Sequence, residues 1–272
     1  MSDETSILVL GMDELASAVA RKLHLAGHAV AIHQPTPPQT IRRRMAFADA
    51  WTDGVCAFEG VEAHRADKSK DFLAALRSGA SIPVLRHPFE DVTTRWPWDV
   101  IVDARTGKGA IPEKLRHRGD FTVGLVPGYC AGEDCDVVID TGARDPGAVH
   151  RLGSITREDS AEDQRFADGR MLLAPRHGVF RGLKRLCDSV AKGEIVGFVG
   201  VTEVAAPASG RLRGLARDGA AMARGAEIAE IVSPGAEFVG ITRRDKLIAR
   251  SVAFVIEMER AGFAPISLEN FL

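Results

Sequence analysis

Three consecutive arginines, Arg42, Arg43 and Arg44, are the residues of this sequence best suited to holding an anion. Each guanidinium is a planar fork of donors that matches the oxygens of a phosphate or a carboxylate. They follow an apolar run at 29–32 that is typical of a buried strand. Ligands of open α/β sheets bind at the carboxyl ends of strands, so Arg42 and Arg43 are candidate phosphate-binding residues. The alternative is that they form the solvated start of a helix.

A second candidate site is the segment 124–134, which joins two predicted strands through a loop rich in small and acidic residues. Its glycines would let backbone N–H groups face an anion, and its two carboxylates could orient a hydroxyl, a metal or a proton. The alternative is a polar turn that is capped by its own carboxylates. The candidate binding residues of this loop are Pro127, Gly128, Gly132, Glu133 and Asp134.

The first turn of the chain is a third candidate. The apolar run 7–10 predicts a strand, and apolar residues from 15 to 26 recur at the spacing of a helix. Between them, Gly11 alone remains of the three glycines with which a dinucleotide-binding turn approaches a pyrophosphate. Asp13 is the expected N-cap and would compete with a phosphate for the same N–H donors. We retain Gly11 as a candidate cofactor-binding residue and expect no standard NAD site.

Few side chains are arranged for catalysis. The sequence shows no Ser/His/Asp order and no histidine-rich metal spacing. Cys130 and Cys135 form a C-x₄-C pair, which is too few ligands for a structural zinc, so no metal site is expected. No catalytic residue is assigned. The positioned acid–base candidates are Asp103, Lys108, Glu133 and Asp134.

The elements that must position these residues change in type along the chain. Strand, helix and strand over residues 7–32 form a βαβ unit, and later apolar runs continue an α/β sheet. After residue 170, nine glycines between positions 178 and 225 separate short alternating runs, which is typical of a small barrel. We predict an α/β protein with four segments. These are a Rossmann-like parallel-sheet domain (1–150), a linker (151–170), an all-β barrel (171–235) and a C-terminal helix and tail (236–272).

The barrel segment contains an internal repeat, and its second copy begins about 32 residues after the first. With the A-P-A-S-G step at 206–210, it resembles the barrel-sandwich hybrid of biotinyl and lipoyl domains. Those domains place the modified lysine about eight residues before the proline, where this chain has 197–204 and no lysine. Lys184 and Lys192 lie well upstream, so neither lipoyl nor biotin is expected. The barrel is then either a rigid spacer or a groove for a partner or cofactor.

Composition limits the function classes. Hydrophobic residues make up 45% of the 272 residues, charged residues 26%, and the formal net charge is −2. This balance provides no basic field for nucleic acid, and no apolar run reaches the roughly 18 residues of a membrane span. The cysteines are few and irregularly spaced, and the polar, acidic N-terminus lacks the positive charge of a secretory signal. We expect a cytoplasmic protein that binds neither nucleic acid nor membrane.

Together these motifs resemble the YqeB-type accessory proteins of selenium-dependent molybdenum hydroxylase systems. Residues 38–54 match that family's P-x-x-I-R-R-x-x-x-F-x-x-A-x-x-x-G segment. Residues 123–134 match its V-x-G-L-x-P-G-(aromatic)-x-A-G-E-D stretch with one position absent, and 206–210 match its A-P-x-x-G. The departure is the first turn, residues 10–16, which lacks the family's glycine-rich G-G-G-D-L-A.

The resemblance implies an accessory protein for the maturation of a molybdenum hydroxylase, with that enzyme as its client. Its ligand would be a nucleotide or a phosphorylated, molybdopterin-type cofactor. Two alternatives stay open: a non-catalytic scaffold or interaction protein, and a small-molecule enzyme that uses Glu133 and Asp134 as acid and base.

Overall fold

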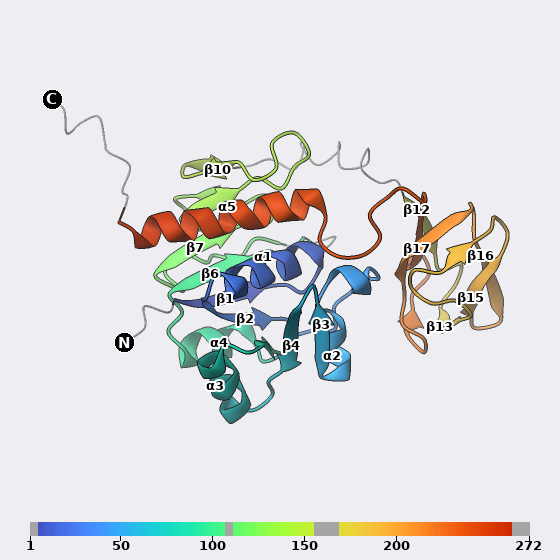
Figure 1. Ribbon diagram of the computed structural model, residues 1–272, viewed down its shortest axis with the longest axis horizontal. Helices are drawn as coiled ribbons and strands as arrows, with labels where there is room; N and C mark the ends of the chain where they lie inside the picture. The colour runs from blue at the N-terminus through green and yellow to red at the C-terminus, as the bar shows by residue number, and fades with distance from the viewer. Residues whose placement is uncertain (1–4, 107–110, 155–168, 263–272) are drawn as a thin grey trace.

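The computed structural model describes residues 5–106, 111–154 and 169–262. A large, mostly parallel sheet with helices on both faces carries the N-terminal part, and two small antiparallel sheets follow it (Figure 1). The mixed α/β class predicted from the sequence is therefore confirmed. In this part of the chain no helix combines the length and apolarity needed to cross a membrane.

In the described residues the large sheet has nine strands in the order β10-β9-β7-β6-β1-β2-β5-β4-β3. The strands from β9 to β4 pair in parallel, whereas β3 and β10 add antiparallel edges. The strands are β1 (Ser6–Leu10), β2 (Ala29–His33), β3 (Val55–Phe58), β4 (Val61–Arg65), β5 (Ile82–Leu85), β6 (Val100–Asp103), β7 (Phe121–Gly124), β9 (Val137–Ile139) and β10 (Val149–His150). The helices are α1 (Glu14–Leu25), η1 (Arg43–Met45), α2 (Asp49–Asp53), α3 (Ser69–Ser78), α4 (Phe89–Arg95) and α5 (Arg243–Arg260).

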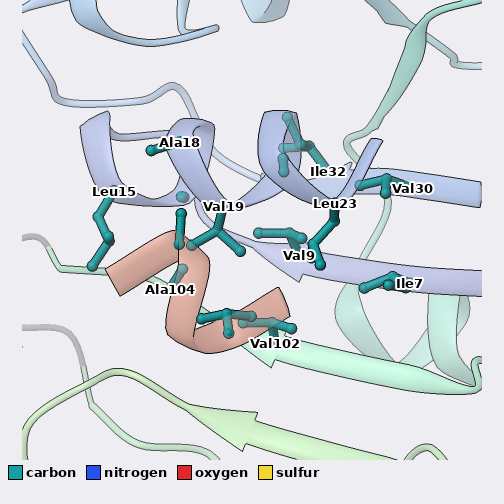
Figure 2. Close-up of a cluster of buried hydrophobic side chains, with 14 of the residues drawn as sticks. Ile7, Val9, Leu15, Ala18, Val19, Leu23, Val30, Ile32, Val102 and Ala104 are labelled. Atoms are coloured by element: carbon teal, nitrogen blue, oxygen red, sulfur yellow. The ribbon is translucent and has the colours of Figure 1, made fainter. Parts of the chain in front are cut away.

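The alternation of β1 builds the core on both faces of this sheet. Ile7 and Val9 face α1, whose Leu15, Val19 and Leu23 cover them at helical spacing (Figure 2). Leu8 and Leu10 belong to the cluster on the other face, under α3 and α4. The C-terminal helix α5, predicted within residues 236–272, packs against α1 and completes the first face.

The two small antiparallel sheets share one core and are called the β unit here. One sheet is β12 (Gly169–Leu173), β19 (Glu227–Val232), β17 (Gly210–Leu215) and β14 (Ser189–Val190). The other is β16 (Thr202–Ala205), β15 (Ile195–Val199), β13 (Gly178–Gly182) and β18 (Ala221–Met222). A separate two-stranded sheet joins β8 (Cys130–Ala131) to β11 (Gly153–Ser154).

The internal repeat appears in the β unit as exchanged strands. Strands β17, β18 and β19 each begin 32 residues after β13, β14 and β15. The middle strands cross over, because β14 pairs with β17 and β18 pairs with β13. The two copies are thus related by an internal two-fold arrangement. The tip of the β15–β16 hairpin carries Val201, which is 86% exposed.

A residue from the N-terminal part completes the core of the β unit. Ile41, from the loop after β2, is buried among the apolar side chains of the β unit. Its carbonyl accepts a hydrogen bond from Leu215 N at 2.9 Å. Gly214 permits this packing, since a Cβ there would lie 2.7 Å from Ile41 Cδ1. The core of the β unit therefore includes a side chain from the loop that follows β2.

Not every element followed from the sequence. The β3–β4 hairpin and α4 were not predicted, and Gly153–Ser154 pairs with β8 although it falls in the predicted linker. Residues 155–168 of that linker lie outside the described residues.

We predict that Ile41→Ala destabilises the protein by about 2–5 kcal/mol, because it leaves a cavity in a core that two parts of the chain share. Urea unfolding of the full chain measures this loss. The matched control is Ile111→Ala, since Ile111 is 75% exposed. Equal stability of the two variants would show that Ile41 does not hold the β unit in place.

Candidate functional site

The loops after β1, β2, β6 and β7 lie along the carboxyl edge of the large sheet, because these strands run parallel. The strand order reverses at β1, which has β2 on one side and β6 on the other. Such a switch point is the usual ligand site of an open α/β sheet. The β unit lies beyond this edge in Figure 1. All sequence-predicted binding residues follow one of these strands.

The first turn is occupied by its own carboxylate. Gly11 has φ +106°, and a Cβ there would lie 3.2 Å from Arg105 Cγ. Asp13 caps α1, as predicted, by accepting from Ala16 N at 3.0 Å. Its second oxygen accepts from the backbone N and the Oγ1 of Thr106 at 2.9 and 2.6 Å. A pyrophosphate in this turn would have to displace Asp13.

A buried network joins the loops after β6 and β7. Asp103 is fully buried and accepts from Arg105 Nε at 2.8 Å and from the Tyr129 hydroxyl at 2.7 Å. The same hydroxyl accepts from Glu113 N at 3.0 Å. Burial, and then the charge of Asp103, raise the pKa of Tyr129, so this phenol remains a donor. Gly124 leaves room for the ring, since a Cβ there would lie 2.7 Å from it.

Three carboxylates gather where α1 and α5 begin. Glu14 accepts from Thr40 Oγ1 at 2.8 Å and lies 4.0 Å from Arg42 Nε. Burial, and then the neighbouring Asp13, raise the pKa of Glu14 to about 7, although Arg42 opposes them. Asp245, in the first turn of α5, is also buried, and burial raises its pKa. Glu14 is therefore the carboxylate of this edge best placed to exchange a proton near neutral pH.

The arginines of the sequence motif hold the β unit. Arg42 donates to Glu230 through Nε and Nη2 at 2.6 and 2.9 Å, and Arg213 donates to the same carboxylate through Nε at 2.8 Å. Glu230 is 2% exposed. Burial alone would raise its pKa, but the bonds from Arg213 and Arg42 lower the pKa to about 2. Glu230 thus adds stability above its ordinary pKa of 4.5, which is lost as the pH falls toward 2.

A second set of ion pairs supports the first. Arg43 Nη1 lies 3.1 Å from Asp49 Oδ1, and Arg217 of the β unit reaches Asp49 at 2.7 Å and Asp53 at 2.9 Å. Arg42 and Arg43 therefore stand at the start of η1, but with guanidinium groups that carboxylates already occupy. A phosphate at Arg42 would have to replace Glu230, and the phosphate-binding role of both arginines stays a prediction.

The loop 127–134 forms a self-capped turn. Asp134 accepts from Cys130 N at 3.0 Å, and Gly132 N donates to the Cys135 carbonyl at 2.8 Å. Glu133 is exposed, and Gly128, at φ +102°, lies beside Pro112. These bonds fit the polar-turn alternative better than an anion nest. The binding roles of Pro127, Gly128, Gly132, Glu133 and Asp134 stay predictions.

The structure does not bring this loop together with the arginine segment. In the described residues, the loop contacts residues 112–116, whereas Arg42 and Arg43 contact Glu14, Glu230 and Asp49. Lys108 lies outside the described residues. Sequence reasoning missed Glu14 because its raised pKa depends on burial at this edge and on the charge of Asp13.

We predict that Glu14→Gln stabilises the protein by an amount that grows between pH 5 and pH 8. The folded-state pKa of about 7 exceeds the ordinary 4.5, so ionised Glu14 disfavours the folded state as the pH rises. Glutamine keeps the acceptor for Thr40 and carries no charge. Urea unfolding at both pH values measures the gain, which should reach about 1–3 kcal/mol at pH 8. A gain that is the same at both pH values would contradict this assignment.

Comparisons with known proteins give one close sequence relative. No protein-family model matches the chain. It is 31% identical over 265 residues to the uncharacterized protein YqeB of Escherichia coli K12, covering 93% of this chain and 47% of that protein.

Two solved structures are similar at much lower levels. An aspartoacylase family protein from Mesorhizobium loti is 13% identical, covering 86% of this chain and 87% of its own, with a TM-score of 0.28. A succinylglutamate desuccinylase/aspartoacylase from Rhodobacter sphaeroides is 12% identical, covering 84% and 85%, with a TM-score of 0.26. At these scores the likeness carries no argument. The chain spans about half the length of the YqeB protein that it matches.

Proposed function

We propose that this chain is an accessory protein in the maturation of a molybdenum hydroxylase and that it binds a nucleotide or a phosphorylated, molybdopterin-type cofactor. The similarity to YqeB and the matched motifs support this role. The proposal includes a Rossmann-like N-terminal domain and a β unit of the lysine-free barrel-sandwich type. The hydroxylase is the proposed client, and the ligand carries the phosphate.

One observation carries the binding part of the proposal. The N-terminal motifs are separate in sequence, yet they follow parallel strands and therefore share the carboxyl edge of the sheet. Gly11 follows β1, residues 38–54 follow β2, and residues 127–134 follow β7. The β unit is anchored to the same edge through Ile41 and Arg42. This edge is where open α/β sheets bind their ligands, which supports a binding role for the loops that carry the motifs.

The β unit suits a rigid structural role better than the role of a covalent carrier domain. Its hairpin tip carries Gly200 and Val201 and no amine, so no amide-linked cofactor can form there. Lys184 pairs with Glu194 inside the β unit, away from that tip. The β unit then covers the sheet edge and offers its outer surface to the client.

A second candidate function is acid–base catalysis on a small molecule, and Glu14 is the observation that favours it. Its pKa of about 7 and its place at the switch point suit a general base better than the exposed Glu133 or the turn-capping Asp134. Catalysis would require Glu14→Gln to abolish turnover while ligand affinity is retained. A maturation protein that only binds would keep its function in this variant.

We predict that deleting the gene leaves the client hydroxylase polypeptide present but inactive, with an incomplete metal or terminal ligand. Immunoblotting, enzyme assay and metal analysis of the purified client measure these three quantities. The wild-type gene should restore activity, and so should Lys184→Arg/Lys192→Arg, because no carrier lysine is needed. Glu133→Gln/Asp134→Asn should fail to restore it.

A deletion strain with a fully active and fully metallated hydroxylase would contradict the maturation role. The scaffold and separate-enzyme alternatives would then remain. Failure of the double lysine variant to restore activity, at normal protein levels, would instead contradict the non-carrier role of the β unit.

A further inference from the structure

A groove of about 480 Å³ lies outside the carboxyl ends of β2, β4 and β5, two strands along from the switch point at β1. This volume is within the usual range of small-molecule sites. None of the sequence motifs identified it. It is lined by Pro35, Trp51, Asp67, Arg86 and His87.

The planar groups of this groove are held in place by their own partners. The Arg86 guanidinium lies 5.0 Å from the centroid of the Trp51 ring, which is cation–π geometry. Asp67 accepts from Arg86 Nε and Nη2, both at 2.9 Å. Trp51 Nε1 donates to the Gln34 carbonyl at 2.9 Å, which fixes the ring. The flat faces are thus organised before any ligand arrives, which lowers the cost of binding.

The charges in the groove argue against a simple anion site. Arg86 already donates to Asp67 through Nε and Nη2, and Arg65 Nε lies 3.1 Å from the same carboxylate. The rest of the lining is the indole of Trp51, the guanidinium face of Arg86, the imidazole of His87 and the ring of Pro35. Such a lining favours a flat, nitrogen-containing ring system, since stacking on aromatic and guanidinium planes tolerates any such ring.

We propose that this groove binds a flat, nitrogen-containing bicyclic ring that includes a pyrimidine, which is the chemistry that purine nucleotides and pterins have in common. The choice of ligand rests on the proposed function, whereas the groove and its stacked side chains do not. Neighbouring strands lie about 4.8 Å apart, so β5 and β1 are separated by about 10 Å across β2. A phosphate attached to a ring in the groove can span that distance and reach the loops that follow β2 and β1.

Isothermal titration of the full chain with guanosine monophosphate, adenosine monophosphate, pterin-6-carboxylate and inorganic phosphate tests this proposal. We expect saturable binding of a purine or of the pterin and none of inorganic phosphate. Arg86→Ala should weaken that binding about tenfold or more. The matched control is Arg118→Ala, because Arg118 forms a similar paired contact with Glu90, at 2.7 and 2.6 Å, and does not line the groove.

Trp51 gives a second variant that keeps the test valid if Arg86→Ala disturbs folding. Trp51→Phe should retain a stacking ring and most of the affinity, whereas Trp51→Leu should lose about tenfold. Urea unfolding of each variant establishes that it is folded at the titration temperature. Purine-only binding would identify a nucleotide ligand and pterin-only binding a pterin ligand, and either supports the proposal.

The proposal is overturned if no ring compound binds or if inorganic phosphate binds as tightly as the ring compounds. It is also overturned if Arg86→Ala and Arg118→Ala have the same affinity for the ring compounds. These outcomes separate it from the maturation role. Ring binding at the groove in a protein whose deletion leaves the hydroxylase active would sustain the groove and refute the maturation role. A deletion phenotype without ring binding would do the reverse.

Discussion

The arrangement of this protein depends on one buried carboxylate, Glu230, and on the two arginines that flank it. A carboxylate that is 2% exposed is costly unless it is paired, and Arg42 and Arg213 supply that pairing from opposite sides of the junction. Breaking such a pair typically costs about 3–5 kcal/mol, because the remaining charge stays buried. With Ile41 in the core of the β unit, this contact fixes the β unit against the carboxyl edge of the large sheet.

The carboxyl edge beside this contact is already occupied at several positions by side chains of the protein. Its first turn is filled by Asp13, and its central strands end in the network around Asp103. The groove beside Trp51 and Arg86 lies farther along the same edge. We therefore describe the protein as a rigid sheet edge with the β unit fixed beside it. A rigid arrangement of this kind suits a protein that holds a cofactor, as in the proposed accessory role, better than a mobile covalent carrier domain.

Much of this architecture could be predicted from the sequence because it depends on local patterns. Apolar runs predicted β1 and β2, helical spacing predicted α1, and the 32-residue repeat predicted two similar halves of the β unit. The partners of Arg42 could not be predicted, because Glu230 is 188 residues away and a fork suits a carboxylate as well as a phosphate. The raised pKa of Glu14 and the groove beside Trp51 likewise arise only when separate loops meet.

Native mass spectrometry of the freshly purified full chain tests whether the carboxyl edge of the sheet binds a ligand. We expect a species heavier than the bare chain by the mass of a nucleotide or a phosphorylated pterin, and denaturation should release that ligand intact. A spectrum of bare chain alone, unchanged after incubation with nucleotides and pterins, would contradict the account and favour a scaffold that binds no cofactor.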